Sequence, residues 1–424
     1  MTSRITRTRN NTAEESLILN QTGKGTPMGE LLRRYWWPVG ISADLNDKPT
    51  LVKLLGEELV LYRDQQGRLG LVGSRCPHRR ANLCFGNVTH DGIRCRYHGW
   101  LMDAEGRVKA TPGEPDKSFK DSVRHPAYPV QELGGIVFAY LGPQPAPALP
   151  PFNFLVDPGE RIVKVTGYAE CNWMPTIENA MDPLHLSFTH APSFKDLRAE
   201  PEVWFEEHDL GVAYVSARPV PGKDGRFGIR VHNLLLPAIS HSGNTDRWIS
   251  GAAGSDDPPI TARWAVPVDD THTLMFRIMY KPEGHVGEWR ECAEDERWDL
   301  AWVATRAEPY QEYREAPSQE AVRLGHTVPP GASREDATIV ESIGAVIDHE
   351  NENLLPTADH GLAMIRQLYL DAATSVQEGG DPPGTFRDLA PDTVVKPRTG
   401  ERMVDAQEYA RLLEQKSVAA SLVS

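Results

Sequence analysis

Two short segments of this chain pair a cysteine with a histidine, and both residue types are metal ligands. One residue separates Cys76 from His78, two separate Cys95 from His98, and sixteen lie between the pairs. Two thiolates and two imidazoles can hold zinc tetrahedrally, or a two-iron, two-sulfur cluster with cysteine on one iron and histidine on the other. Common zinc fingers do not mix the two ligand types within each half. The mixed halves favour the iron–sulfur cluster, and zinc is the alternative.

A second group of ligand residues lies further along the chain, at Asp182, His185 and His190. Asp182 and His185 are three residues apart and would share one face of a helix. His190 lies about 140° further round an ideal helix than His185, so both can face one ion only if the helix bends or ends between them. Pro192 supports a helix end there. The alternative is an ordinary helix start, with Asp182 as the N-cap and Pro183 in the first position.

The elements that would position these ligands fall into two kinds. We expect residues 1–37 to be a tail and a helix, and short apolar runs split by turn signals predict strands within residues 38–150. A proline-rich stretch, 143–151, marks a domain edge, and residues 151–424 mix strand-like and helical patterns. Helices are expected over residues 27–37, 173–190, 289–311, 335–347, 359–373 and 405–416.

Composition excludes several other kinds of protein. The 424 residues carry 59 acidic and 45 basic side chains, a net charge of −14, which argues against binding to nucleic acid or to anionic lipid. The longest apolar stretch, around 135–141, is far too short to cross a membrane. The first residues lack the apolar core of a secretion signal, so we expect a cytoplasmic protein. Five sparse cysteines do not make a disulfide framework.

The two cysteine–histidine pairs, with the strand pattern over residues 40–145, resemble the Rieske [2Fe–2S] domain. The second motif, Glu178-Asn179-x-x-Asp182-Pro183-x-His185-x4-His190, extends the likeness to the oxygenase (α) subunits of Rieske non-heme iron oxygenases, and residues 25–39 resemble the start of their phthalate dioxygenase group. The resemblance implies an α+β protein, with an all-β Rieske domain at 38–150 and a catalytic domain at 151–424 built on an antiparallel sheet with flanking helices.

The resemblance also assigns roles to residues. Cys76, His78, Cys95 and His98 would hold the cluster, while His185 and His190 would bind a mononuclear iron(II). The third iron ligand is a carboxylate far downstream, for which Asp336 is our choice. Glu335, Glu341 and Asp348 compete with it, and a solvated helix-terminal carboxylate is the alternative for Asp336. Asn179 and Asp182 would belong to the catalytic site, with Asp182 bonded to His185 and to the partner subunit's His98.

Such a subunit would hydroxylate an aromatic substrate with dioxygen, in the catabolism of aromatic compounds, and we expect that substrate to carry a carboxylate. Its electrons would come from NADH through a separate flavin and iron–sulfur reductase, and it would form a homotrimer or a hexamer of stacked trimers. The alternatives are an O-demethylase or monooxygenase and, more remotely, a non-enzymatic electron carrier. A substrate carboxylate needs a cation, for which we prefer Arg247 over Arg230, Arg263 and Arg277. For each arginine the alternative is an ordinary strand or surface residue.

Overall fold

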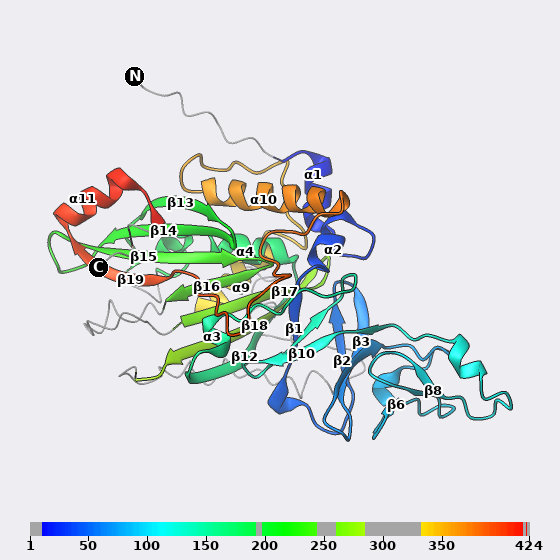
Figure 1. Ribbon diagram of the computed structural model, residues 1–424. Coiled ribbons are helices and arrows are strands. Elements are labelled where there is room, and N and C mark those ends of the chain that lie inside the picture. Colours follow the sequence, from blue (N-terminus) through cyan, green and yellow to red (C-terminus); the bar gives the residue numbers. More distant parts are fainter. Residues whose placement is uncertain (1–10, 192–196, 244–259, 285–331, 419–420, 422–424) are drawn as a thin grey trace.

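The computed structural model describes residues 11–191, 197–243, 260–284, 332–418 and 421. A small β lobe projects from a larger lobe that contains one long sheet and most of the helices (Figure 1). None of the described helices is long and apolar enough to cross a bilayer. The helix predicted over residues 289–311, and Arg247, lie outside the described residues.

The small lobe consists of three antiparallel sheets. The sheet nearest the large lobe has the order β1 (Trp36–Ile41), β11 (Ile136–Tyr140), β10 (Val130–Leu133). The second has the order β2 (Thr50–Leu54), β3 (Glu57–Arg63), β4 (Leu69–Gly73), β9 (Ala127–Tyr128). The third, at the tip, has the order β5 (Asn87–Thr89), β6 (Gly92–Arg94), β7 (Leu101–Met102), β8 (Val108–Ala110). Short 3₁₀ turns lie at Ser42–Asp44, Leu83–Phe85 and Phe119–Ser122.

The helix predicted over residues 27–37 was wrong in its second half. Helix α2 (Pro27–Leu32) ends early, and Trp36 and Trp37 begin strand β1. The cause lies in Pro38, because a residue that precedes proline is disfavoured in the helical region. Pairing of β1 with β11 then buries both tryptophans, which outweighs their helix propensity.

The large lobe is built on an eight-stranded antiparallel sheet. Its order is β12 (Gly159–Ala169), β18 (His272–Pro282), β17 (Ile260–Asp269), β16 (Ile239–Gly243), β15 (Arg226–Leu235), β14 (Gly211–Pro219) and β13 (Glu202–His208). The eighth strand, β19 (Gly400–Asp405), pairs with the first half of β15. The other helices are α1 (Ala13–Asn20), α3 (Asn153–Val156), α4 (Trp173–Ala180), α5 (His185–Phe188), α9 (Ala332–Ser342), α10 (His360–Gln377) and α11 (Ala406–Gln415).

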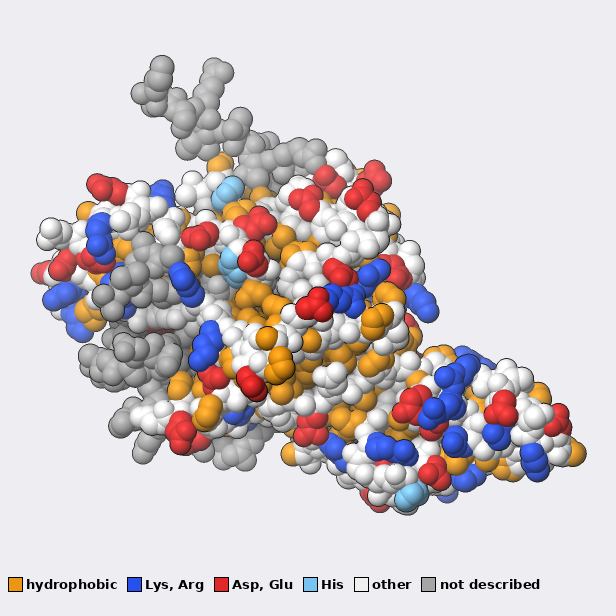
Figure 2. Space-filling model, viewed as in Figure 1, with side chains coloured by type: hydrophobic (Ala, Val, Ile, Leu, Met, Phe, Trp, Pro, Cys, Tyr) orange, Lys and Arg blue, Asp and Glu red, His pale blue; other side chains and the backbone are white. Residues whose placement is uncertain are grey.

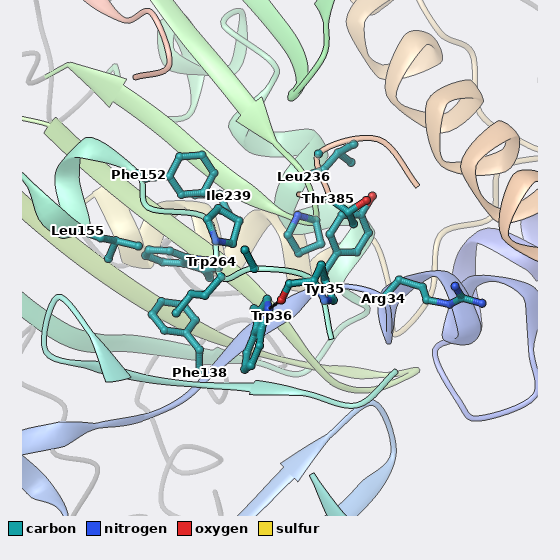
Figure 3. Close-up of a pocket in the computed structure, with 16 residues that line it drawn as sticks. Arg34, Tyr35, Trp36, Phe138, Phe152, Leu155, Leu236, Ile239, Trp264 and Thr385 are labelled. Carbon is teal, nitrogen blue, oxygen red and sulfur yellow. Dashed lines mark hydrogen bonds between the residues drawn. The ribbon is translucent and has the colours of Figure 1, made fainter. Parts of the chain in front are cut away.

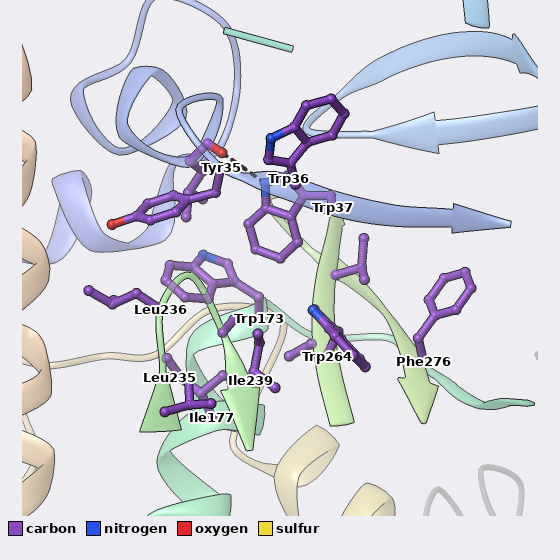
Figure 4. Close-up of a cluster of buried hydrophobic side chains, with 14 of the residues drawn as sticks. Tyr35, Trp36, Trp37, Trp173, Ile177, Leu235, Leu236, Ile239, Trp264 and Phe276 are labelled. Atoms are coloured by element: carbon purple, nitrogen blue, oxygen red, sulfur yellow. Dashed lines mark hydrogen bonds between the residues drawn. The ribbon is translucent and has the colours of Figure 1, made fainter. Parts of the chain in front are cut away.

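One hydrophobic core runs from β1 and β11 of the small lobe into the large sheet. Three fully buried tryptophans belong to this core: Trp37 of β1, Trp173 of α4 and Trp264 of β17 (Figure 4). A second, smaller core fills the tip of the small lobe and includes both Cys76 and Cys95. The tip therefore carries the cysteine–histidine pairs on a core of its own.

The turn between β2 and β3 fastens the small lobe to the large sheet. Leu55 and Gly56 donate backbone hydrogen bonds to the carbonyls of Pro267 and Val268, each at 2.9 Å. Beside them, Lys53 Nζ lies 2.6 Å from the carboxylate of Asp269. These contacts fix the small lobe against the end of β17.

Candidate active site and metal centres

His185 and His190 come together because a helix ends between them. Helix α5 ends at Phe188, and the two imidazole rings lie 5.2 Å apart, centroid to centroid. The Asp182 carboxylate accepts the backbone N–H groups of Leu184 at 2.7 Å and His185 at 3.3 Å. The alternative interpretation, with Asp182 as the N-cap and Pro183 in the first position, is wrong, because helix α5 begins at His185 and its N-cap is Leu184. The Asp182 carboxylate instead holds the turn that precedes the helix and aims His185.

Asp336 of α9 completes a group of three donors. Its Oδ1 atom lies 3.0 Å from His190 Nε2 and 3.5 Å from His185 Nε2. One ligand atom from each residue lies within 4.8 Å of the other two. Two imidazoles and one carboxylate on one side of an ion are the donor set of non-heme iron(II) sites that leave positions open for dioxygen.

The other ring nitrogens show that the residues suit a metal. His190 Nδ1 lies 2.6 Å from the carboxylate of Glu335, and His185 Nδ1 bonds the backbone carbonyl of Asp182. An imidazole that donates from Nδ1 keeps a lone pair on Nε2 for a metal, and such outer acceptors also raise its basicity. Both Nε2 atoms lie beside Asp336, so the residues present fit a divalent ion.

The electrostatics agree with this arrangement. Burial would lower the pKa of His190, but Asp336 and Glu335 raise it above its usual value. Burial would raise the pKa of Asp336, but the two histidines and a hydrogen bond from Asn179 lower it. Burial lowers the pKa of His185. A carboxylate kept ionised beside two imidazoles is the protonation state that a metal requires.

The competing acidic residues have other positions. Glu335 faces the outer nitrogen of His190. Glu341 accepts the backbone N–H of Glu170 at 3.0 Å, and Asp348 is exposed. Of the four candidates, Asp336 is the one that lies between the two imidazoles.

The expected bond from the Asp182 carboxylate to His185 is absent from the described site. The nearer carboxylate oxygen lies 4.0 Å from His185 Nδ1, because that nitrogen bonds the Asp182 main-chain carbonyl instead. One carboxylate oxygen accepts the backbone N–H groups of Leu184 and His185, and the side chain remains 27% exposed. Asp182 can therefore still accept a hydrogen bond from outside the chain.

The two cysteine–histidine loops have the same backbone shape. Cys76 donates its N–H to the carbonyl five residues later, and Cys95 does so as well, at 2.9 Å and 2.8 Å. In each loop, the fourth residue after the cysteine donates back to the cysteine carbonyl and has a positive φ: 63° at Arg80 and 73° at Gly99. Two matching loops of this kind can grip a cluster from two sides.

The side chains of these loops separate by type. Cys76 and Cys95 are buried, whereas His78 is exposed and His98 half-buried. The two imidazoles lie 4.7 Å apart, and His78 stacks on Trp100 at 5.0 Å. Burial, with a smaller contribution from Cys95, raises the pKa of Cys76 to about 11, so this sulfur needs a cation to become a thiolate. Buried sulfurs and outward imidazoles suit a Rieske cluster.

Comparison with known proteins decides the family. The Rieske [2Fe–2S] domain family matches residues 35–129. The phenoxybenzoate dioxygenase subunit alpha of Ectopseudomonas oleovorans is 35% identical over 90% of both chains. The 5,5'-dehydrodivanillate O-demethylase oxygenase subunit of Sphingobium sp. (strain NBRC 103272 / SYK-6) is 34% identical, over 89% of this chain and 84% of its own. The chain belongs to the Rieske non-heme iron oxygenases. It is an oxygenase component that incorporates dioxygen, and its Rieske domain carries a [2Fe–2S] cluster.

A solved structure agrees in fold. A fluorene-bound complex of the oxygenase and ferredoxin of carbazole 1,9a-dioxygenase, in a variant form, aligns with a TM-score of 0.55 at 22% identity. The alignment covers 85% of this chain and 96% of that one. The predicted fold class, a Rieske β domain followed by an α+β domain, is confirmed.

One arginine that sequence reasoning missed lies beside the iron motif of this oxygenase. The guanidinium of Arg218 bonds the carbonyl of Pro183, two residues before His185, and that of Ala199 at 3.1 Å. Arg218 is nearly buried, at 6% exposed. No sequence signal marked it, because only strand pairing places it near the iron motif.

The arginines that the sequence did single out lie on neighbouring strands of the same sheet. Arg230 points to the same side as Arg218, since both charges act on Tyr214, and it lies 3.1 Å from Glu401 of β19. Arg263 and Arg277 are opposite each other in the β17–β18 pairing. The sheet therefore brings guanidinium groups from several strands toward the iron motif.

A buried ion-pair group lies behind the iron motif and was also not predicted. Arg366 of α10, 1% exposed, bonds both carboxylate oxygens of Glu178 at 2.6 and 2.9 Å. It also bonds Glu352 at 2.7 Å. Glu178 is next to Asn179, which bonds Asp336. The group therefore fixes α4, the helix that carries Asn179.

A small cavity lies elsewhere, at the junction of β1, β11 and the large sheet (Figure 3). Trp36, Phe138 and Trp264 line it, and its volume is about 20 Å³. That volume holds a water molecule at most, so the cavity is too small for an aromatic substrate.

Proposed function

We propose that this oxygenase subunit binds a mononuclear iron(II) through His185, His190 and Asp336 and hydroxylates an aromatic carboxylate. The observation that carries the proposal is the convergence of three ligand atoms within 4.8 Å, with both outer imidazole nitrogens already bonded. Iron(II) bound there would supply the activation of dioxygen, with electrons from the [2Fe–2S] cluster on Cys76, His78, Cys95 and His98.

The surrounding residues orient the ligands. Glu335 and the Asp182 carbonyl fix the two ring orientations, and Asn179 holds the carboxylate of Asp336. Arg218 holds the turn between Asp182 and His185 through Pro183. Such outer contacts keep a site in shape before a metal binds, which reduces the cost of binding.

Two observations support a carboxylated aromatic substrate. The relatives in the comparison are named for phenoxybenzoate and dehydrodivanillate, both of which are carboxylates. The iron-facing side of the sheet carries Arg218, Arg230 and Arg263, and guanidinium groups recognise carboxylates. Arg247 stays a candidate. O-demethylation is the second candidate reaction, because one of the two relatives is named as an O-demethylase.

Electron delivery requires partners. One structure of similar fold is an oxygenase–ferredoxin complex, which supports a separate electron donor, here an NADH-dependent flavin and iron–sulfur reductase. We further propose a homotrimer or stacked trimers, in which the partner subunit's His98 reaches Asp182. Exposed apolar side chains support it: Phe85 and Tyr97 in the small lobe are 61% and 57% exposed, and Phe188 and Ile343, on the segments that carry the proposed iron ligands, are 64% and 53% exposed. Figure 2 shows the small lobe projecting from the rest of the molecule. The cytoplasmic location stays a prediction.

The first test is the content of iron and acid-labile sulfide in anaerobically purified protein. We expect about three irons and two sulfides per chain, with the visible spectrum of a Rieske cluster. His185→Ala should lose about one iron and all turnover of aromatic carboxylates while it keeps that spectrum. Retained turnover in this variant would sink the iron assignment, and zinc without sulfide would contradict both centres.

A further inference from the structure

Strand β15 presents a histidine on the side of the sheet that faces the iron motif. His232 pairs with Tyr214 of β14, and Arg218 lies on the same face of β14, four residues beyond Tyr214. Arg218 bonds the carbonyl of Pro183, so this face of the sheet lies against the iron motif. Asn233, the next residue, points to the opposite face, because side chains alternate along a strand.

The His232 ring is held in one position. It stacks on Tyr214 with centroids 5.0 Å apart and planes 6° from parallel. Its Nε2 atom lies 3.0 Å from Ser240 Oγ on β16. The side chain is only 4% exposed, and Nδ1 has no hydrogen-bond partner among the described residues. A buried polar atom without a partner is destabilising, so its retention calls for a ligand.

The hydrogen-bond partners of Ser240 indicate which ring nitrogen of His232 carries the hydrogen. Within the described part of the chain, the Ser240 hydroxyl has one hydrogen-bond partner, His232 Nε2. If Nε2 donated, the buried hydroxyl hydrogen would have no acceptor. The satisfied arrangement has Ser240 donating to Nε2, which places the ring hydrogen on Nδ1. His232 then presents an N–H donor near the cationic groups of Arg230 and Arg263.

The charge state of the ring follows from its surroundings. Burial and the neighbouring cations hold the pKa of His232 well below its usual value. The ring is therefore neutral near pH 7, and its single hydrogen stays on one nitrogen. His232 is thus a directional donor beside the arginines and not a further cation.

We propose that His232 determines specificity by donating a hydrogen bond from Nδ1 to an oxygen of a ring substituent, which with the neighbouring arginines is a carboxylate oxygen. This assignment rests on the proposed oxidation of an aromatic carboxylate. His232 contacts the substrate, and Ser240 positions it by fixing the tautomer. A hydrogen bond to a charged acceptor contributes more than one between neutral groups.

The test compares two ligands that differ only in the carboxylate: phenoxybenzoate and diphenyl ether. Their Kd values would be measured by calorimetry on the iron-loaded protein, wild type and His232→Leu. We expect His232→Leu to weaken phenoxybenzoate about 10- to 100-fold and diphenyl ether less than about threefold. His232→Asn keeps an N–H close to the Nδ1 position and should recover most of the affinity. In turnover, KM should rise more than kcat falls.

The matched control is His241→Leu. His241 is a fully buried histidine on β16 that pairs with Asn233 and contacts Phe154, away from the proposed contact. Its loss should leave both Kd values unchanged. Equal weakening of both ligands by His232→Leu, or no weakening, would overturn the role of His232. Wild-type protein that binds neither ligand would contradict the proposed substrate class, and this inference with it.

Discussion

At the residue scale, two adjacent acids on α9 face the same histidine from opposite sides. Asp336 approaches Nε2 of His190 and Glu335 approaches Nδ1, at 3.0 Å and 2.6 Å. An acceptor that makes a ligand imidazole more basic strengthens metal binding without touching the metal. Substitutions of the two residues should therefore affect iron(II) binding to different extents.

Glu335→Gln should weaken iron(II) binding about 10- to 100-fold, because the amide still accepts the hydrogen but no longer carries the charge. Asp336→Asn should remove the bound iron. Both are measured as iron(II) Kd by anaerobic chelator competition, with the Rieske spectrum as the internal reference. Glu341→Gln is the control, since its carboxylate accepts the backbone N–H of Glu170 and lies outside the group of iron ligands. Wild-type affinity in Glu335→Gln would rule out this role.

Local sequence patterns predict some residues of this site but not others. The histidines could be predicted because their spacing is local, and the motif that links them is contiguous. Asp336 could not be separated from Glu335 by spacing alone, since neighbours on a helix point about 100° apart and either can face inward. Arg218 is placed by strand pairing, which no local pattern encodes.

At the element scale, the two cluster loops share a backbone shape but not a residue at the strained position. Gly99 has a φ of 73°, and an added Cβ would meet Pro112 at 3.2 Å. Arg80 has a φ of 63° and is exposed. A left-handed φ suits glycine and costs other residues about 1 kcal/mol or more.

Gly99→Ala should therefore lower the free energy of unfolding by about 1–2 kcal/mol, whereas Arg80→Gly should leave it equal or slightly higher. Urea unfolding followed by the visible absorbance of the cluster measures both. The same sign for the two variants would contradict the equivalence of the loops.

The elements themselves were predicted well where the pattern was periodic and poorly where one residue decides. Helices near 359–373 and 405–416 match α10 and α11 to within a few residues. The helix over 27–37 failed at Pro38, where a tertiary pairing was also needed to bury two tryptophans.

At the scale of the whole molecule, the contact between Asp269 of the large lobe and Lys53 of the small lobe should make the free energy of unfolding depend on pH. Burial would raise its pKa, but hydrogen bonds from His272 and Lys53 hold it well below its usual value. A depressed folded-state pKa stabilises the protein fully above the unfolded value of about 3.9, and this contribution is lost progressively as the pH falls from there toward the folded-state pKa. Wild type should exceed Asp269→Asn by about 1–3 kcal/mol in unfolding free energy at pH 7.

That difference should begin to shrink as the pH falls below about 4 and should decrease further toward the folded-state pKa, in urea titrations at several pH values. Asp91→Asn, at an exposed turn of the small lobe, should show no such difference. A gap that stays constant as the pH falls well below about 4 would mean that the carboxylate charge does not matter at this junction.

Trimer formation predicts that two inactive variants rescue one another. A His98→Ala subunit keeps its iron site and a His185→Ala subunit keeps its cluster. Mixed oligomers made by co-expression should recover part of the wild-type turnover, because electrons would cross between subunits. Mixed oligomers as inactive as the separate variants would show that each chain transfers electrons within itself.

Helix α1 makes its tertiary hydrogen bonds with segments that lie far along the chain from it. Asn20 of α1 accepts a hydrogen bond from Asn172, the N-cap of α4, and donates one to the carbonyl of Ile347. Ser16 bonds His349. Helix α1 therefore leaves the ribosome before these partners, which emerge more than a hundred and more than three hundred residues later. Its docking is therefore completed in two steps: the bond to Asn172 can form once α4 has emerged, and the bonds to Ile347 and His349 can form only after most of the chain has been made.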